Sequence, residues 1–141
     1  MWRRTFLLAF SSTLAGARPA ADAKQQVFDL FTKIASELSA GNALAFLEAV
    51  DPDMAHFADF EHDVMALTEQ AEITNSIEVV SETGDDHQRA EELDWFVEIV
   101  GRSESRAVER RRAVIKFRLE RRGKKWKIVG IDPLHFFAPP K

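Results

Sequence analysis

The sequence predicts an α+β domain in which three N-terminal helices pack in a strongly curved, four-stranded antiparallel sheet, a cone-shaped α+β barrel. Two observations support this fold class. Apolar residues recur at helical spacing through the first half of the chain and change near Ile73 to the alternation typical of strands. Turn residues then divide the second half into four consecutive strands with no helix between them, which is the order of an antiparallel meander.

The three helices are expected from their apolar faces and from the residues that end them. Gly41 suits the end of the first helix, Asn42 suits the N-cap of the second, and Asp51-Pro52-Asp53 interrupts the chain before the third. The expected ranges are 24–40, 43–50 and 54–70. Their apolar faces contain Val27, Phe28, Phe31, Ile34 and Leu38, then Leu44, Phe46 and Leu47, then Phe57, Phe60, Val64 and Leu67.

Four strands are expected in the second half, the first of them through Ile73, Ile77 and Val79. The other three cover residues 87–100, 106–121 and 125–131, and the later strands are long enough that we expect the sheet to curl around the helices. The side chains expected to point inward are Leu93, Trp95, Val97 and Ile99, then Ala113, Ile115, Phe117 and Leu119, then Trp126 and Ile128.

The first 23 residues have the layout of a secretory signal peptide. Arg3 and Arg4 provide positive charge, an apolar stretch begins at Phe6, and small residues precede Ala17 and Ala23. The apolar stretch is too short to span a bilayer. We expect cleavage after Ala23, with Ala17 as the alternative, export to the periplasm or the medium, and no stable membrane insertion afterwards. The arginine pair fits the general export route and the twin-arginine route equally.

The composition limits what the remaining domain, residues 24–141, can be. Its length suits one domain. The chain has no cysteine, which excludes disulfides, a thiolate metal site, a thiol nucleophile and a lipid-anchoring cysteine. The net charge of the chain is −4, and removing the signal leaves 16 basic and 22 acidic residues, a net charge of −6. An acidic domain is a poor candidate for binding nucleic acid, and we expect no cofactor and no metal site.

Two stretches of the chain resemble a known superfamily. Residues 38–47, with the Ala40-Gly41-Asn42-Ala43 junction between helices, and residues 124–131, which read Lys-Lys-Trp-Lys-Ile-Val-Gly-Ile, are similar to the nuclear transport factor 2-like superfamily (SnoaL-like and ketosteroid-isomerase-like proteins). The resemblance covers the whole of the expected domain. It implies a cone-shaped fold with a pocket at the wide end, among exported members of unknown function.

The resemblance supplies no catalytic residue. Ketosteroid-isomerase-like members use an acidic base and a tyrosine-based oxyanion site, and this chain contains no tyrosine. Dehydratase-like members use Tyr, His and Asp, and no position here matches them. The catalytic residues are therefore unknown, and an enzyme is the less favoured interpretation. The candidate ligand-binding residues of the cone are Phe46, Phe57, Phe60, Trp95, Trp126 and Asp132.

Several polar groups leave two interpretations open. His56, Asp59, His62 and Asp63 follow one helix and could serve as a base or a metal site, but a solvated helix surface is the preferred interpretation. A second set falls on the inward phase of the strands or at their ends, where an inward carboxylate could become a base. This second set contains Asn75, Glu91, Glu109, Arg111 and Asp132.

The basic stretch from Arg110 to Lys127 also has two interpretations. It could bind nucleic acid, or it could be the outer face of two paired strands. We favour the outer face, with Glu92, Asp94 and Glu98 as cross-strand partners. The aromatic tail, His135 to Pro140, is expected to cover the sheet edge or the pocket mouth, or to dock on a second copy.

Three functions follow in order of preference. The first is an exported, non-catalytic domain that binds a small apolar ligand or a partner protein in its cone. The second is an acid–base enzyme of the dehydratase, isomerase or cyclase type, which would need Asp132, Glu91 or His56 deep in an open cavity. The third is a structural module that forms a homodimer through its sheet.

Overall fold

The computed structural model describes the backbone of residues 19–141 and the side chains from Asp22 onward. The basic and apolar segments of the expected signal lie outside these residues. The elements follow the expected order: helices α2 (Pro19–Ser39), α3 (Ala43–Leu47) and α4 (Phe57–Gln70), then strands β1 (Ala71–Gly84), β2 (Gln88–Gly101), β3 (Val108–Arg122) and β4 (Lys125–Asp132), then the short 3₁₀ helix η1 (Leu134–Phe137).

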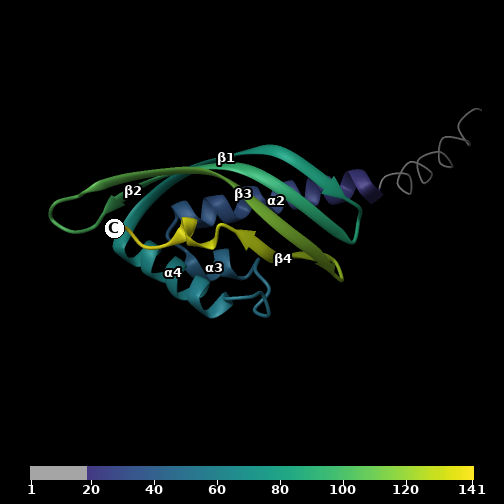
Figure 1. The fold of residues 1–141 in the computed structure, drawn as a ribbon, viewed down its shortest axis with the longest axis horizontal. Coiled ribbons are helices and arrows are strands. Elements are labelled where there is room, and N and C mark those ends of the chain that lie inside the picture. The colour runs from purple at the N-terminus through teal and green to yellow at the C-terminus, as the bar shows by residue number, and fades with distance from the viewer. Residues whose placement is uncertain (1–18) are drawn as a thin grey trace, which may run out of the picture.

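The four strands form one antiparallel sheet in the order β1-β2-β3-β4, which confirms the predicted α+β class. The sheet arches over α2, while α3 and α4 lie below (Figure 1). It is curved but unclosed, since β1 and β4 each have a single neighbour in it. No helix within residues 19–141 is long and apolar enough to cross a membrane.

The strand alternation places the side chains as expected. Along β2, every second side chain points inward and is buried, from Leu93 to Ile99. The inward side chains of β3 and β4 include Ile115, Phe117 and Ile128, each at most 1% exposed. Within the described chain these residues belong to one buried hydrophobic core.

The helices differ from the prediction at their ends and on one face. Helix α2 packs with Val27, Phe31 and Leu38, whereas Phe28 is 47% exposed and lies outside the core, so the predicted apolar face was one position too wide. Helix α3 ends before the predicted limit and α4 begins after it. The reason is a series of turns between them, held by the Asp51 carboxylate, which accepts a hydrogen bond from the backbone N–H of Asp53 at 2.8 Å.

The caps between α2 and α3 are those that the sequence predicts. Gly41 adopts a left-handed φ of 75°, and the Asn42 side chain accepts a hydrogen bond from the Ala45 N–H at 3.1 Å. At the other end of α2, Ala23 is fully buried in the core. Cleavage after Ala23 would remove the first turn of α2, whereas cleavage after Ala17 would leave the helix whole.

Candidate binding groove

The interior of the cone is filled by the chain's own tail. The ring of Phe137 is fully buried and packs edge-on against Trp95 at 5.2 Å and against Phe60 at 5.9 Å between ring centroids. Phe46 lies 5.5 Å from the same ring. The aromatic tail therefore enters the cone, and three of the expected ligand-binding side chains contact it in place of a ligand.

The remaining candidates for ligand binding lie elsewhere. Phe57 is half-buried at the start of α4. Trp126 is buried near the turn between β3 and β4. Its indole N–H donates to the Gln26 side chain at 3.0 Å, and the Arg121 guanidinium lies over its ring. Asp132 is exposed at the end of β4. Across the described residues, the structure gathers Phe46, Phe60 and Trp95 and separates them from the other three.

The acid–base candidates border one hollow of 460 Å³ but do not converge in it. His56 and Asp132 are exposed on its rim. Glu91 is 4% exposed and is paired with the Arg89 guanidinium at 3.1 Å. Burial raises the pKa of the Glu91 carboxyl, and the hydrogen bond from Arg89 acts against that rise.

Asn75 and the polar residues of α4 have structural positions. The Asn75 amide accepts from the Trp95 indole at 2.8 Å and donates to the Ala35 carbonyl at 2.9 Å, which joins the sheet to α2. Asp59 and His62 are exposed on α4, as the preferred interpretation of that helix expects.

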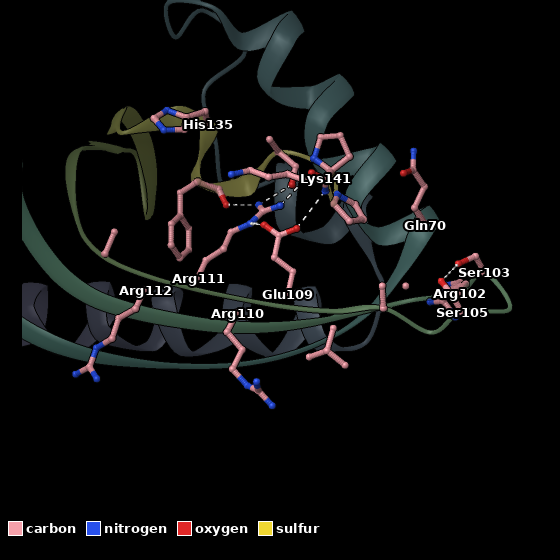
Figure 2. A pocket seen from close by; sticks show the side chains of 18 of the residues that line it. Gln70, Arg102, Ser103, Ser105, Glu109, Arg110, Arg111, Arg112, His135 and Lys141 are labelled. Carbon is pink, nitrogen blue, oxygen red and sulfur yellow. Dashed lines mark hydrogen bonds and ion pairs between the residues drawn. The ribbon is translucent and has the colours of Figure 1, made fainter.

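A large hollow lies at the end of the sheet where β2 turns into β3, which we call the open end. It is a groove of 1190 Å³ between the first half of β3 and the tail (Figure 2). One wall consists of residues 101–113 and the other of residues 133–141 with Gln70. The ionisable side chains of its lining are Arg102, Glu109, Arg110, Arg111, Arg112, His135 and Lys141.

Arg111 fastens the tail along this groove. Its guanidinium donates to the carbonyl oxygens of Phe136 and Ala138 at 2.7 Å each, and to that of Pro139 at 3.0 Å (Figure 2). Its Nε–H donates to Glu109 at 2.7 Å, and the other oxygen of Glu109 accepts from the Lys141 N–H at 3.1 Å. The Arg111 hydrogen bond holds the pKa of Glu109 below its ordinary value. One ion pair thus fixes three carbonyl groups, one in η1 and two in the residues that follow it.

Along this groove, the edge of β3 is open. β4 pairs with β3 only from Lys116 to Arg122, so within the described chain residues 108–115 have β2 as their one strand neighbour. The Arg121 N–H donates to His87, on the side of β2, and β3 pairs with β2 without a register shift. Peptide groups alternate in direction along a strand. The N–H and C=O groups of the even-numbered residues, Val108, Arg110, Arg112 and Val114, therefore face the open side.

The arrangement of helices and sheet matches solved structures across most of the chain. A nuclear transport factor 2-like protein from Salmonella enterica superimposes with a TM-score of 0.62 and 10% identity, over 86% of this chain and 94% of that one. A conserved protein from Planctomyces limnophilus gives 0.62 and 9%, over 79% and 93%.

The chain has the nuclear transport factor 2-like fold.

Another structure of similar arrangement is described as a candidate aromatic ring hydroxylase from Novosphingobium aromaticivorans. It has a TM-score of 0.65 and 13% identity, over 79% of this chain and 87% of that one. No family model and no curated protein sequence matches this chain. The nuclear transport factor 2-like fold is therefore established from structure, and its members differ too much in sequence to transfer an activity.

Within this nuclear transport factor 2-like fold, the outer face of the sheet holds the basic stretch. Arg112 donates to both carboxylate oxygens of Asp94, at 3.1 and 2.8 Å, which lowers the pKa of Asp94. Arg110 pairs with Glu98 at 3.0 Å. These contacts are the cross-strand pairs that the sequence predicts for a solvated outer face.

Sequence reasoning placed Arg111 and Glu109 on the inward phase of their strand but did not connect them with the tail. The available signal was their position, since two charged residues pointing into a core need partners there. The partners of Arg111 are mostly backbone carbonyls. Every residue has a carbonyl group, so the sequence does not indicate which of them will accept these hydrogen bonds.

Proposed function

We propose that this protein is an exported, non-catalytic binding domain that captures an extended segment of a partner polypeptide in the groove at its open end. The observation that carries the proposal is the open edge of β3 beside that groove. An extended peptide can add to such an edge as a further strand, with main-chain hydrogen bonds providing much of the affinity.

The geometry of the edge suits such a strand. Within residues 108–114, the peptide groups of four alternate residues face the groove. The groove volume of 1190 Å³ exceeds the usual range of small-molecule pockets. The edge of β4, by comparison, is already occupied, because Ile128 exchanges backbone hydrogen bonds with Ala49 and Asp51 at 2.8 Å. The groove thus lies beside the stretch of β3 that still has main-chain groups to offer.

The packed interior favours a partner polypeptide over a small apolar ligand. A ligand in the cone would have to displace Phe137, which is fully buried and fastened through Arg111. The groove requires no such displacement. Export is supported by the layout of the first 23 residues.

Hydrogen exchange tests the proposal directly. We would select binders for the purified protein from a library of short random peptides and compare amide exchange with and without a binder. We expect protection of the N–H groups of Val108, Arg110, Arg112 and Val114, whose direction leaves them without a strand partner. A library without binders, or protection confined to β1, would contradict the proposal.

A second candidate, an acid–base enzyme, is favoured by the raised pKa of Glu91. Its carboxyl is 4% exposed and paired with Arg89, and His56 and Asp132 lie on the rim of the hollow that it borders, which ranks the enzyme second. Native mass spectrometry of the purified protein, with a denatured control, separates the two. A retained small molecule of defined mass would favour the enzyme, and a bare chain the binding domain.

A further inference from the structure

The open half of β3 carries two arginines whose side chains flank the groove from outside. Arg110 and Arg112 are 64% and 70% exposed, and they extend from the face of β3 opposite to Arg111 and Glu109 (Figure 2). Both are even-numbered residues, so their backbone N–H and C=O groups face the open edge. A strand that pairs there would set two of its side chains directly beside these guanidinium groups.

The two arginines have room for a further anion. Their present partners, Glu98 and Asp94, lie on β2, on the side away from the groove. Both pairs are exposed to solvent, where an ion pair contributes little and exchanges readily. A guanidinium has five N–H groups, of which Arg110 uses one on Glu98 and Arg112 uses two on Asp94. An incoming carboxylate can therefore share each arginine without breaking its present pair.

The inner side of the groove has a different character. Side chains of an added strand alternate between the outer face and the inner face. On the inner face they would meet Ala113, Phe136, Ala138 and Pro139, which line the groove there. This lining is mainly apolar, because Arg111 is turned to the tail carbonyls and Glu109 to Arg111.

We infer that the partner segment is an acidic strand, in which two carboxylate residues stand on either side of one apolar residue. The two carboxylates lie beside Arg110 and Arg112 on the outer face, and the apolar side chain lies against the tail. This inference rests on the proposed strand addition and names the chemistry of the partner.

A second copy of the chain is a poorer occupant of the same edge. A symmetric antiparallel pair of β3 strands, centred on this stretch, would bring the arginines of both copies side by side, and like charges on neighbouring strands are destabilising. The acidic β1 edge of a second copy, with Glu72 and Glu78, is the remaining self-association, and the test below reports it.

The test uses peptides of about eight residues, long enough to span the open stretch of β3. Three versions share one sequence and differ at its centre, which reads Glu-Val-Glu, Gln-Val-Gln or Lys-Val-Lys. Fluorescence anisotropy measures their affinity for the purified protein. We expect the acidic peptide to bind about fivefold more tightly than the neutral one at low salt, as two exposed cross-strand charge pairs would give. The lysine peptide should bind most weakly, and high salt should remove the differences.

Variants locate the effect. The double substitution Arg110→Gln and Arg112→Gln should bring the acidic and neutral peptides to equal affinity. Lys116→Gln is the matched control, because Lys116 lies on the same face of β3 where β4 already covers the edge. This control should leave the preference for the acidic peptide unchanged.

The outcomes separate the inference from the function on which it rests. Equal affinity of the acidic and neutral peptides would overturn the acidic preference and leave strand addition standing. If neither peptide binds at any salt concentration, both proposals fail. Concentration-dependent association of the protein alone, measured by sedimentation and abolished by Glu72→Gln with Glu78→Gln, would replace the peptide with a second copy.

Discussion

The two ends of the sheet contain the same pair of residues in different surroundings. At the end that carries the two hairpin turns, Arg89 and Glu91 stand two positions apart on β2 and point inward, with 4% of each side chain exposed. At the open end, Arg111 and Glu109 stand two positions apart on β3, with 13% and 25% exposed. The carboxylate lies 3.1 Å from Nε in the first pair and 2.7 Å in the second.

The pKa values of the two glutamates move in opposite directions. For Glu91 burial is the largest influence and raises the pKa, whereas for Glu109 the hydrogen bond from Arg111 is the largest and lowers it. Arg89 has a second carboxylate nearby, Glu82 at 3.6 Å, and Arg111 has the tail carbonyls instead. The comparison shows that an Arg-Glu pair two positions apart on a strand can link β2 to β1 at one end of the sheet and hold the C-terminal tail at the other.

The largest expected effect concerns the tail. Phe137→Ala should lower the free energy of unfolding by about 3–5 kcal/mol, because a fully buried aromatic ring leaves a cavity among Phe46, Phe60 and Trp95. Urea unfolding measures it. Phe28→Ala is the control at an exposed phenylalanine and should change stability by less than about 1 kcal/mol. Equal effects of the two substitutions would mean that the tail is not part of the core.

Arg89→Met tests the hairpin end. Removing one partner of a buried ion pair leaves Glu91 uncompensated, so we expect a loss of about 3 kcal/mol at neutral pH. The loss should shrink as the pH falls, because Arg89 opposes the burial that raises the pKa of Glu91. Without Arg89 that pKa rises further, so the folded variant takes up a proton at higher pH than the wild type and is relieved of the buried charge. Unfolding measured across a pH series follows this change, and a loss independent of pH would show that Glu91 does not need Arg89 as a counter-charge.

Arg111→Met tests the open end and should cost about 2 kcal/mol, since three tail carbonyls lose a charged donor. The tail amides should also exchange faster, while those of β2 keep their protection. Arg110→Met removes an exposed neighbour on the same strand and should cost less than about 1 kcal/mol. Unchanged exchange in the tail of the Arg111 variant would exclude Arg111 as its fastening.

Glu109→Gln should give the smallest effect, about 1 kcal/mol at neutral pH. A carboxyl with a lowered pKa stabilises the folded state above its ordinary pKa of 4.5 and loses that contribution as the pH falls. The free energies of unfolding of the wild-type protein and this variant should therefore converge in acid. The Arg89 variant also approaches its wild type in acid, but there the cause is a raised pKa, that of Glu91. A stability difference between Glu109→Gln and the wild type that persists in acid would contradict this account.

The sequence predicted the fold through periodicity. Alternation from Leu93 to Ile99 gives the inner face of β2, and Asp51-Pro52-Asp53 gives the break before α4, because both depend on neighbours in the chain. Phe28 shows where periodicity fails. It lies next to Val27 on the helix surface, and only the position of the sheet decides which of the two is covered.

The candidate site was harder to predict. The aromatic residues of the cone were recognised by type, but whether they surround a ligand or Phe137 depends on where the tail goes, and the tail has no periodicity of its own. The open edge of β3 follows from the shortness of β4, whose end at Asp132 is visible in the sequence. The direction of each peptide group along that edge requires the register with β2.

The alternation of β3 has an evolutionary consequence. Odd-numbered residues such as Ile115 and Phe117 build the core, while even-numbered residues such as Arg110 and Arg112 present the proposed binding edge. Mutations at the two sets are therefore nearly independent in their effects. A lineage could change the partner it recognises by exchanging two surface side chains, with the selection that maintains folding acting on different positions of the same strand.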